Sequence, residues 1–315
     1  MTNNPKAFDF GSLRRIPLGQ RASLSNLSQM AQTHQPGDTL KYFFEKLPDH
    51  LAARDLKSLA QAIVKARQKG CPVMLGMGAH PIKVGLSPII IDLIRRNIIT
   101  SLAVNGAVLV HDYETAVGGS TSEDVDEALG NGSFGVTLET GRDLAHFVNE
   151  GAKNALGLGE AVARGIVRMK PEYVEYSLLA ACHETKTPLT VHVAIGTDVT
   201  HLAPELNFAR LGEAAGRDFA RFISLVGEME GGVYLNLGSA VILPEVFLKA
   251  VSAARNTGSK LSNITTANMD FFRHYRPLTN VVERPTKSGG RGYHLTGHHE
   301  IMFPLLAAIV LEGFS

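Results

Sequence analysis

Two periodicities of hydrophobic and polar positions alternate along the chain, and they predict its elements. Short apolar runs are typical of buried strands, whereas apolar side chains at roughly every third or fourth position indicate helices that bury one face. The predicted strands are residues 73–75, 102–104, 189–195, 233–237 and 263–266. The predicted helices are residues 39–69, 82–97, 121–129, 141–168, 171–186, 205–226, 243–257 and 303–311. Strands that alternate with helices predict an α/β fold, with a doubly wound, mostly parallel, Rossmann-like sheet that carries helices on both faces.

Residues 73–112 are the most informative part of this pattern. They read as a strand, a glycine-rich turn, a helix, a second strand and a polar loop that ends in His111 and Asp112. Gly76 and Gly78 follow the first apolar run, where glycine lets the backbone turn sharply and approach a bound group. A βαβ unit of this kind presents its ligand-binding crevice beyond the carboxyl ends of its strands.

Small or polar residues follow each predicted strand. In a doubly wound sheet these turns lie at one edge, so residues far apart in the sequence become neighbours. Small residues leave room for a flat ligand, backbone amides suit phosphates, and carboxylates suit ribose hydroxyls, so this edge is interpreted as a nucleotide site. The side chains expected there are His80, Asn105, Asp198, His201, Asn236, Ser239, Asn268 and Asp270.

Other interpretations of these residues stay open. The G-x-G-x-x-G fingerprint is absent, because Pro81 stands at the position of its third glycine, and the sequence contains no Walker loop. Asp198 could cap a helix that begins near Val199, and His111 with Asp112 could be a helix-start pair.

The C-terminal region holds the densest set of ionisable groups. His298, His299 and Glu300 precede an apolar helix and are candidate metal ligands together with histidines from the strand ends. Adjacent histidines point in different directions, however, and the H-E-x-x-H spacing is missing. The alternative is that Glu300 caps the last helix while the histidines bond across a subunit contact. The glycines within residues 289–292 predict a mobile loop.

Composition narrows the class of protein. The 315 residues are 44% hydrophobic, enough for one large core, and the formal net charge of +1 argues against a nucleic-acid partner. We find no apolar run of about 18–20 residues and no secretory signal, so we expect no membrane span and a cytoplasmic location. Cys71 and Cys182 are expected to be buried thiols. Residues 1–38 form an arm that embraces a neighbouring subunit or is disordered, and residues 39–315 form one domain.

Four blocks, in this order and spacing, resemble deoxyhypusine synthases. They are VMLGMGAHPIKVGLSPIIIDLIRRNIITSLAVNGAVLVHDYE, LTVHVAIGTDVTHL, GGVYLNLGSAVILP and IMFPLLAAIV, all within residues 72–310. The resemblance implies a doubly wound NAD-binding fold and a homodimer or homotetramer with active sites between paired subunits. It also implies oxidation of spermidine, followed by transfer of its aminobutyl group to a lysine.

The resemblance also implies a cofactor site. It matches small-residue turns after the first and second strands, an acidic pair near the ribose and nicotinamide at His111 and Asp112, and an aspartate of the pocket at Asp198. The family's Asn-Thr-Ala turn near the adenosine matches residues 266–268. Together with the other strand-end residues, the expected NAD contacts are Gly78, Ala79, His80, Asn105, Gly106, Asp198, Asn236, Ser239, Thr266 and Asn268.

The substrate side departs from that family. The chain contains no tryptophan, so the Trp-Gly-Lys segment with the family's catalytic lysine is missing. Lys287 is the candidate replacement, although an exposed loop lysine is the favoured interpretation. The sequence LGSAVILPE stands where the family has paired histidines. We therefore do not expect synthesis of deoxyhypusine itself.

The expected function is NAD-dependent hydride transfer from a small amine or polyol. His111 or His201 would act as the base, because imidazole titrates near neutral pH, and Asp112 would orient the cofactor or steer a cationic substrate. One alternative is a metal-assisted hydrolase that uses His298, His299 and Glu300. The other is a non-catalytic module that binds NAD.

Overall fold

The computed structural model describes residues 5–314, which form parts of two compact units, Met1–Ala53 and Arg54–Ser315. The first unit contains three single turns of 3-10 helix, Phe10–Ser12, Leu18–Gln20 and Leu27–Gln29, and the short helix α1, Leu40–Lys46. Backbone bonds from Gln32 to Lys46 and from Asp49 to Gln29 hold residues 29–49 together. The long helix α2, Leu51–Gln68, leads into the second unit.

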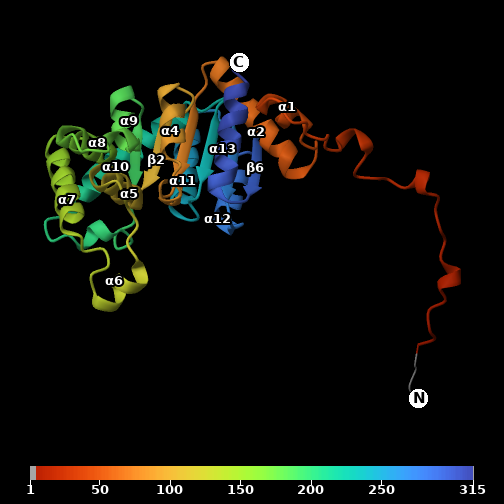
Figure 1. The fold of residues 1–315 in the computed structure, drawn as a ribbon, viewed down its shortest axis with the longest axis horizontal. Coiled ribbons are helices and arrows are strands. Elements are labelled where there is room, and N and C mark those ends of the chain that lie inside the picture. The colour runs from red at the N-terminus through yellow and green to blue at the C-terminus, as the bar shows by residue number, and fades with distance from the viewer. Residues whose placement is uncertain (1–4, 315) are drawn as a thin grey trace. The chain divides into compact units, whose positions relative to one another are not determined.

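The second unit is built on one six-stranded sheet. All neighbouring strands are parallel, and their order is β3-β2-β1-β4-β5-β6. This confirms the predicted doubly wound fold, with the order reversing between β1 and β4. In Figure 1, α12 lies at the lower, carboxyl edge of the sheet, and α13 runs from that edge to the C-terminus at the top. The strands are β1 Val73–Met77, β2 Ser101–Asn105, β3 Leu189–His192, β4 Val233–Leu237, β5 Thr265–Asp270 and β6 Arg291–Thr296.

Helices cover both faces of the sheet, so the strands are buried on both sides. Successive side chains of a strand point to opposite faces. Val73 and Leu75 accordingly pack into the larger apolar cluster with α2, α4, α5 and α13, whereas Met74 packs into a second cluster with α10 and α11. The helices of this unit beyond α2 are α3 His80–Lys83, α4 Ser87–Arg95, α5 Gly106–Gly118, α6 Val125–Asn131, α7 Leu138–Lys153, α8 Leu158–Met169, α9 Leu178–Thr185, α10 Phe208–Gly227, α11 Ile242–Asn256, α12 Tyr275–Pro277 and α13 His299–Glu312.

Four predicted helices are wrong in their extent. Residues 39–69 contain both α1 and α2, and residues 171–186 contain a 3-10 turn, Val174–Tyr176, before α9. The other two breaks have a clear cause in the backbone. Residues 82–97 were expected to form one helix, but Gly85, at φ 79°, ends α3 before α4 begins. Residues 141–168 contain most of α7 and all but the last residue of α8, because Ala155 adopts a left-handed conformation and Gly157 starts the next helix. Apolar periodicity continues across both breaks, so it does not reveal them.

Three strand predictions also differ from the structure. β3 ends at His192, although the strand was expected to continue to residue 195. β5 continues to Asp270, so residues 265–270, which were expected to form a turn, are the strand itself. β6 was missed, because the glycines within residues 289–292 suggested a mobile loop. Gly292 instead lies so close to the Val282 carbonyl that a Cβ would overlap it, and the burial of β6 alternates as in an edge strand. Over residues 5–314, we find no helix with both the length and the apolar character needed to cross a bilayer.

Candidate functional site

The carboxyl edge of the sheet collects polar groups that lack partners. Within residues 5–314, eight buried side-chain atoms have no hydrogen-bond partner, and five of them lie at this edge. A buried polar group without a partner costs about 1–3 kcal/mol, so a cluster of them indicates a ligand site. The five atoms are Asn105 Oδ1, Asp198 Oδ2, His201 Nε2, Asn236 Oδ1 and His299 Nε2.

Two of these residues, Asn105 and Asp198, lie at the N-terminus of α5. This helix begins directly after β2, with Asn105 as its N-cap, yet the Asn105 side chain makes no capping hydrogen bond. Gly106 lies against the Asp198 carboxylate so closely that a Cβ at this position would overlap it. The partial positive charge of a helix N-terminus favours a neighbouring anion. Glycine is therefore required at position 106 for the carboxylate to reach the first turn of α5.

Asp198 and His201 form a donor and acceptor pair inside the loop that follows β3. Both side chains are almost fully buried, with exposed fractions of 6% and 5%. The Nδ1 atom of His201 accepts hydrogen bonds from the amides of Gly196 (3.1 Å) and Asp198 (3.3 Å), so the ring proton lies on Nε2. This Nε2 atom is 3.8 Å from Asp198 Oδ2. A ligand hydroxyl could accept from the imidazole and donate to the carboxylate at the same time.

Burial and charge act on Asp198 in opposite directions. Burial raises the pKa of this carboxyl group above its usual value, while His201 and a hydrogen bond from Thr197 lower it. The expected helix-capping role is present only in part. Asp198 does precede a single turn of 3-10 helix, Val199–Leu202, but its Oδ2 atom remains unpaired.

A second set of polar residues lies beside the turns that follow β1 and β4, where the strand order reverses. The Gly78 amide donates to the Leu237 carbonyl at 3.1 Å, and a Cβ on Gly78 would overlap the Gly238 carbonyl, so the turns after β1 and β4 touch. Beyond them, His80 Nδ1 is 2.9 Å from His299 Nδ1. Ala79 lies between these features as the N-cap of α3. Sequence reasoning placed His80 at this edge but missed its pairing with His299.

The polar residues of β4 and β5 mostly bond to one another. Asn236 uses both amide hydrogens, on the Ser239 carbonyl (2.8 Å) and on Asn268 Oδ1 (2.6 Å). Ser239 Oγ accepts from the Leu243 amide at the start of α11. Among the fully buried side-chain atoms of this group, Asn236 Oδ1 has no hydrogen-bond partner. Thr266, an expected cofactor contact, is buried inside β5, and its hydroxyl donates to the Val281 carbonyl at 2.7 Å.

Asp112 is a structural residue, which corrects its expected catalytic role. The expected polar loop is absent, since α5 begins at Gly106, and Asp112 points into the core with no exposed surface. Its carboxylate accepts from the Ser177 hydroxyl (2.5 Å) and from the Leu178 amide (2.6 Å). It therefore stabilises the N-terminus of α9 from inside the protein.

His111 keeps one free ring nitrogen. The Thr121 hydroxyl donates to Glu114 Oε2 at 2.6 Å, so it accepts the Nδ1 proton of His111 at 2.7 Å. Burial, aided by Lys83, lowers the pKa of His111 to about 4. His111 is thus a neutral and weak base in the second turn of α5.

The expected metal site does not assemble. His298 is exposed and lies 3.7 Å from Glu300, whereas His299 is fully buried and faces His80. In the described part of the chain, no group of three or more His, Cys, Asp or Glu residues is placed to hold a metal ion. The reason is the geometric one: adjacent residues at the start of a helix point in different directions. Lys287 is exposed in the turn before β6, so it lies toward the amino edge of the parallel sheet and not at the carboxyl edge.

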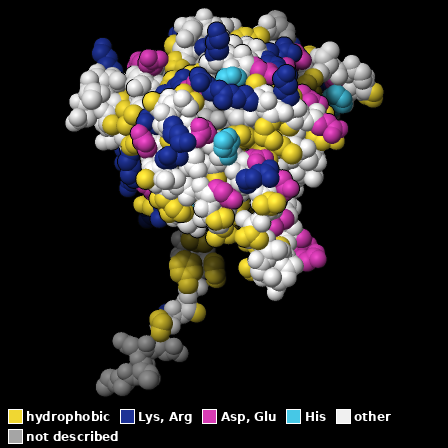
Figure 2. Space-filling model, turned by 90° about the vertical axis from the view of Figure 1, so that its left-hand side faces the viewer, with side chains coloured by type: hydrophobic (Ala, Val, Ile, Leu, Met, Phe, Trp, Pro, Cys, Tyr) yellow, Lys and Arg dark blue, Asp and Glu magenta, His cyan; other side chains and the backbone are white. Residues whose placement is uncertain are grey.

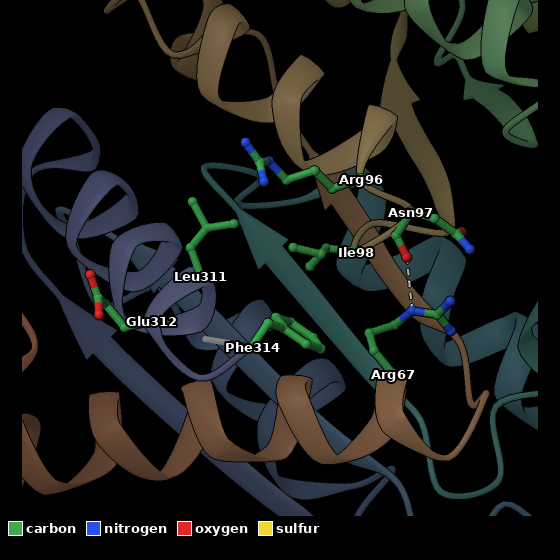
Figure 3. A pocket seen from close by; sticks show the side chains of 7 residues that line it. All are labelled: Arg67, Arg96, Asn97, Ile98, Leu311, Glu312 and Phe314. Carbon is green, nitrogen blue, oxygen red and sulfur yellow. Dashed lines mark hydrogen bonds between the residues drawn. The ribbon is translucent and has the colours of Figure 1, made fainter.

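Several hollows lie away from this edge. The one in Figure 3, of about 740 Å³, is at the amino edge, where Arg67 donates to the Asn97 carbonyl and Leu311 and Phe314 line the wall. Figure 2 shows Lys and Arg side chains over the face that carries α7, α8 and α9. A hollow of about 870 Å³ there includes Arg164, which pairs with Glu160. No side chain lining these hollows is among the unpartnered buried groups found within residues 5–314.

No family model and no curated protein match the sequence, whereas solved structures match its fold. Unliganded AgrE has a TM-score of 0.57 and 16% identity, over 82% of this chain and 33% of AgrE. The ternary complex of AgrE with ornithine and NAD+ has a TM-score of 0.51 and 18% identity, over 85% of this chain and 34% of AgrE. This chain therefore spans about a third of the length of AgrE.

Two further structures were compared. A candidate LOR/SDH protein from Methanococcus maripaludis S2 has a TM-score of 0.52 and 14% identity, over 84% of this chain and 71% of that one. A candidate deoxyhypusine synthase from Entamoeba histolytica has a TM-score of 0.46 and 9% identity, over 90% and 96% of the two chains. The AgrE and LOR/SDH likenesses show a shared fold.

Proposed function

We propose that this chain binds NAD at the carboxyl edge of its sheet and transfers hydride from a small amine or polyol. One observation carries the proposal: Asn105, Asp198 and His201 direct unpartnered buried polar atoms to the first turn of α5. In a sheet with this strand order, that edge is where dinucleotides bind.

The residues present fit the cofactor. The Asp198 carboxylate would accept a hydrogen bond from a ribose hydroxyl, and His201 Nε2 would donate one to the same oxygen, 3.8 Å from the carboxylate. Asn105 Oδ1 would accept from a second hydroxyl. Bound NAD+ would supply the acceptor for the hydride. AgrE, which shares the fold, has been solved with ornithine and NAD+, and this supports the choice of cofactor.

Deoxyhypusine synthesis is not part of the proposal. The chain lacks the tryptophan of the Trp-Gly-Lys segment, and Lys287 is exposed. The metal-assisted hydrolase is also set aside, because His298 and His299 point to different surroundings.

Binding of NAD+ to the full chain, measured by titration calorimetry, tests the proposal. The unaltered chain should bind NAD+, and Asp198→Asn should weaken binding about tenfold or more, since it removes one charged acceptor worth about 1.5–3 kcal/mol. Asp126→Asn is the matched control. Asp126 is exposed in the first turn of α6, so this change should leave the Kd unaltered.

A measurement of turnover distinguishes an NAD-dependent enzyme from a module that only binds NAD. NADH formation should be followed with a set of small amines and polyols in the presence of NAD+. Failure of both NAD+ and NADH to bind would refute the proposal. Binding with no hydride transfer to any member of the set would instead favour the non-catalytic module.

A further inference from the structure

A pair of histidines, the half-buried His80 and the fully buried His299, joins two segments that lie 219 residues apart in the sequence. His80 comes at the start of α3, and His299 at the start of α13. Their Nδ1 atoms are 2.9 Å apart, which is hydrogen-bond distance, so one ring must donate and the other must accept. His299 has no exposed surface. The direction of this bond decides which nitrogen of His80 carries its proton.

Asp270 sets that direction. His299 Nε2 is 3.8 Å from Asp270 Oδ1, at the end of β5, and the carboxylate favours a proton on this nitrogen. Burial and the neighbouring His80 lower the pKa of His299, whereas Asp270, the Met269 carbonyl and Glu300 raise it, and the net downward shift favours the neutral ring with a single proton. With that proton on Nε2, His299 Nδ1 is the acceptor. His80 must then donate from Nδ1, which leaves its Nε2 atom with a free lone pair.

The surroundings hold the pair in place. Gly238, at φ 63°, lies so near His299 that a Cβ would be 2.7 Å from the ring carbon Cε1. The Phe271 ring packs at 5.2 Å from His80 and 5.5 Å from His299, measured between ring centroids. Within residues 5–314, no hydrogen bond from a protein group occupies His80 Nε2. The lone pair is therefore available to a ligand beside the turns of β1 and β4.

We propose that His80 is the proton-accepting catalytic residue of this site, and that His299 and Asp270 are positioning residues that keep its Nε2 atom unprotonated. This inference rests on the proposed NAD-dependent function. In the reaction, the O–H bond of a substrate alcohol breaks and its proton forms an N–H bond on His80. The hydride leaves the carbinol carbon for NAD+, which gives a carbonyl product and NADH. The Asp270 carboxylate, 3.8 Å from His299 Nε2, would stabilise the positive charge formed on His80 electrostatically.

The free Nε2 atom of His80 favours a hydroxy compound as the substrate. A neutral imidazole with an unprotonated Nε2 atom accepts the proton of a hydroxyl group as hydride leaves the carbon that carries it. Charged groups of both signs act near this edge, Lys83 on His111 and Asp270 on His299, so charge alone does not select the substrate.

Other histidines fit the role less well. His201 carries its proton on the nitrogen that faces Asp198, so it is a donor in this state. His111 has a pKa of about 4 and accepts protons weakly at neutral pH. His80 is the residue whose free nitrogen is fixed by a hydrogen bond to a second histidine, His299, which lies 3.8 Å from the Asp270 carboxylate.

The tautomer of His80 is the decisive observation. Nitrogen-15 NMR of the full chain labelled in histidine, at neutral pH and without cofactor, reports which ring nitrogen is protonated. His80→Asn identifies the resonances, and its amide group can still donate to His299. We expect a protonated Nδ1 and a bare Nε2 on His80. A proton on His80 Nε2 would refute the positioning role proposed for His299 and Asp270, and this measurement needs no variant of His299.

Chemical reactivity tests the positioning residues independently of turnover. Diethyl pyrocarbonate acylates unprotonated imidazole nitrogens, and mass spectrometry locates the product. His299→Leu removes the acceptor and should slow acylation of His80 by roughly tenfold, the effect of about 1.4 kcal/mol on the tautomer equilibrium. His299→Asn places an amide oxygen near the position of Nδ1 and should restore most of the rate. The exposed His298→Asn is the control, and equal acylation rates in His299→Leu and His298→Asn would contradict the positioning role of His299.

Kinetics then connect this positioning role with the chemistry. Using any hydroxy compound that yields NADH, His80→Asn should lower kcat by roughly 100-fold or more, while the Kd for NAD+ stays near that of the unaltered chain. A small loss of kcat would refute the catalytic role. Absence of NAD+ binding together with the expected tautomer would refute the proposed function, whereas NAD+ binding with the opposite tautomer would refute the positioning role alone.

Discussion

Asp112 stabilises one helix from the interior of another. It lies on α5, is fully buried, and accepts hydrogen bonds from Ser177 and Leu178 at the start of α9. Burial nevertheless raises its pKa to about 6, against the effect of these donors. The group thus combines good hydrogen bonds with a charge that is costly to bury, so its contribution to stability depends on pH.

The raised pKa of Asp112 determines the direction in which stability changes with pH. The pKa of an aspartate in the unfolded chain is 3.8, so between this value and about 6 the native state binds more protons than the unfolded state. Stability from Asp112 is therefore fully present below pH 3.8 and is lost as the pH rises through 6. The loss is about 3 kcal/mol by pH 7, because one pKa unit corresponds to about 1.4 kcal/mol.

Asp112→Asn tests this expectation, because asparagine does not titrate. Relative to the unaltered chain, the variant should gain about 3 kcal/mol of unfolding free energy between pH 4 and pH 7. Denaturant unfolding at several pH values measures the difference. Asp92→Asn, which changes an exposed carboxylate paired with Arg96, is the control and should show a much smaller change. A flat difference for Asp112→Asn would refute the assigned shift.

Asp112 also shows that the local sequence does not determine the direction in which a side chain points. His111 and Asp112 follow a strand and were assigned to a polar loop, yet both are helical and point to different partners. A local pattern shows that polar groups are present. The direction of each side chain depends on which turn of α5 faces the core, and this is fixed only when α9 packs against α5.

At the scale of elements, the junction of β2 and α5 is the part of the site most sensitive to a small change. The strand ends at Asn105 and the helix begins at Gly106 without a connecting loop. The Asp198 carboxylate fills the space where a side chain at position 106 would lie. The position of the Asp198 carboxylate therefore depends on the absence of a side chain at the first residue of α5.

Gly106→Ala should separate binding from stability. The added Cβ must displace the Asp198 carboxylate, so we expect NAD+ binding to weaken about tenfold, as when one charged hydrogen bond is lost. Alanine itself suits the first turn of a helix, so the free energy of unfolding should change by less than about 1 kcal/mol. Calorimetry and denaturant unfolding measure the two quantities. Gly118→Ala, near the other end of α5 and without close neighbours, is the control. Unchanged affinity in Gly106→Ala would contradict the role given to Asp198.

Elements with strong periodicity were predictable, and weakly patterned ones were not. The strand over residues 233–237 was predicted with the bounds that β4 has. β6 lies at the edge of the sheet, and only part of it is buried, so its six residues lack the apolar run that identifies central strands. β6 forms its backbone hydrogen bonds with β5, and this pairing cannot be predicted from the composition of β6.

At the scale of the whole molecule, the proposed cofactor should stabilise the second unit. A ligand that binds only the folded state raises the free energy of unfolding by about 2.7 kcal/mol when its concentration is about 100 times its Kd. NAD+ should therefore raise the unfolding midpoint of the full chain. Slower hydrogen exchange should appear at the carboxyl ends of β1 and β2 and in the loop around Asp198 and His201. Protection at the amino edge near Arg67 would place the ligand elsewhere.

The sequence by itself determined the fold class and the edge of the sheet that gathers polar residues. Both follow from local periodicity and from the geometry of parallel strands, whose carboxyl ends must lie together. Only the tertiary structure decided that His80 meets His299 and that Asp112 caps α9. These contacts join elements distant in sequence, and their partners are selected by how helices pack on the sheet, which no local pattern encodes.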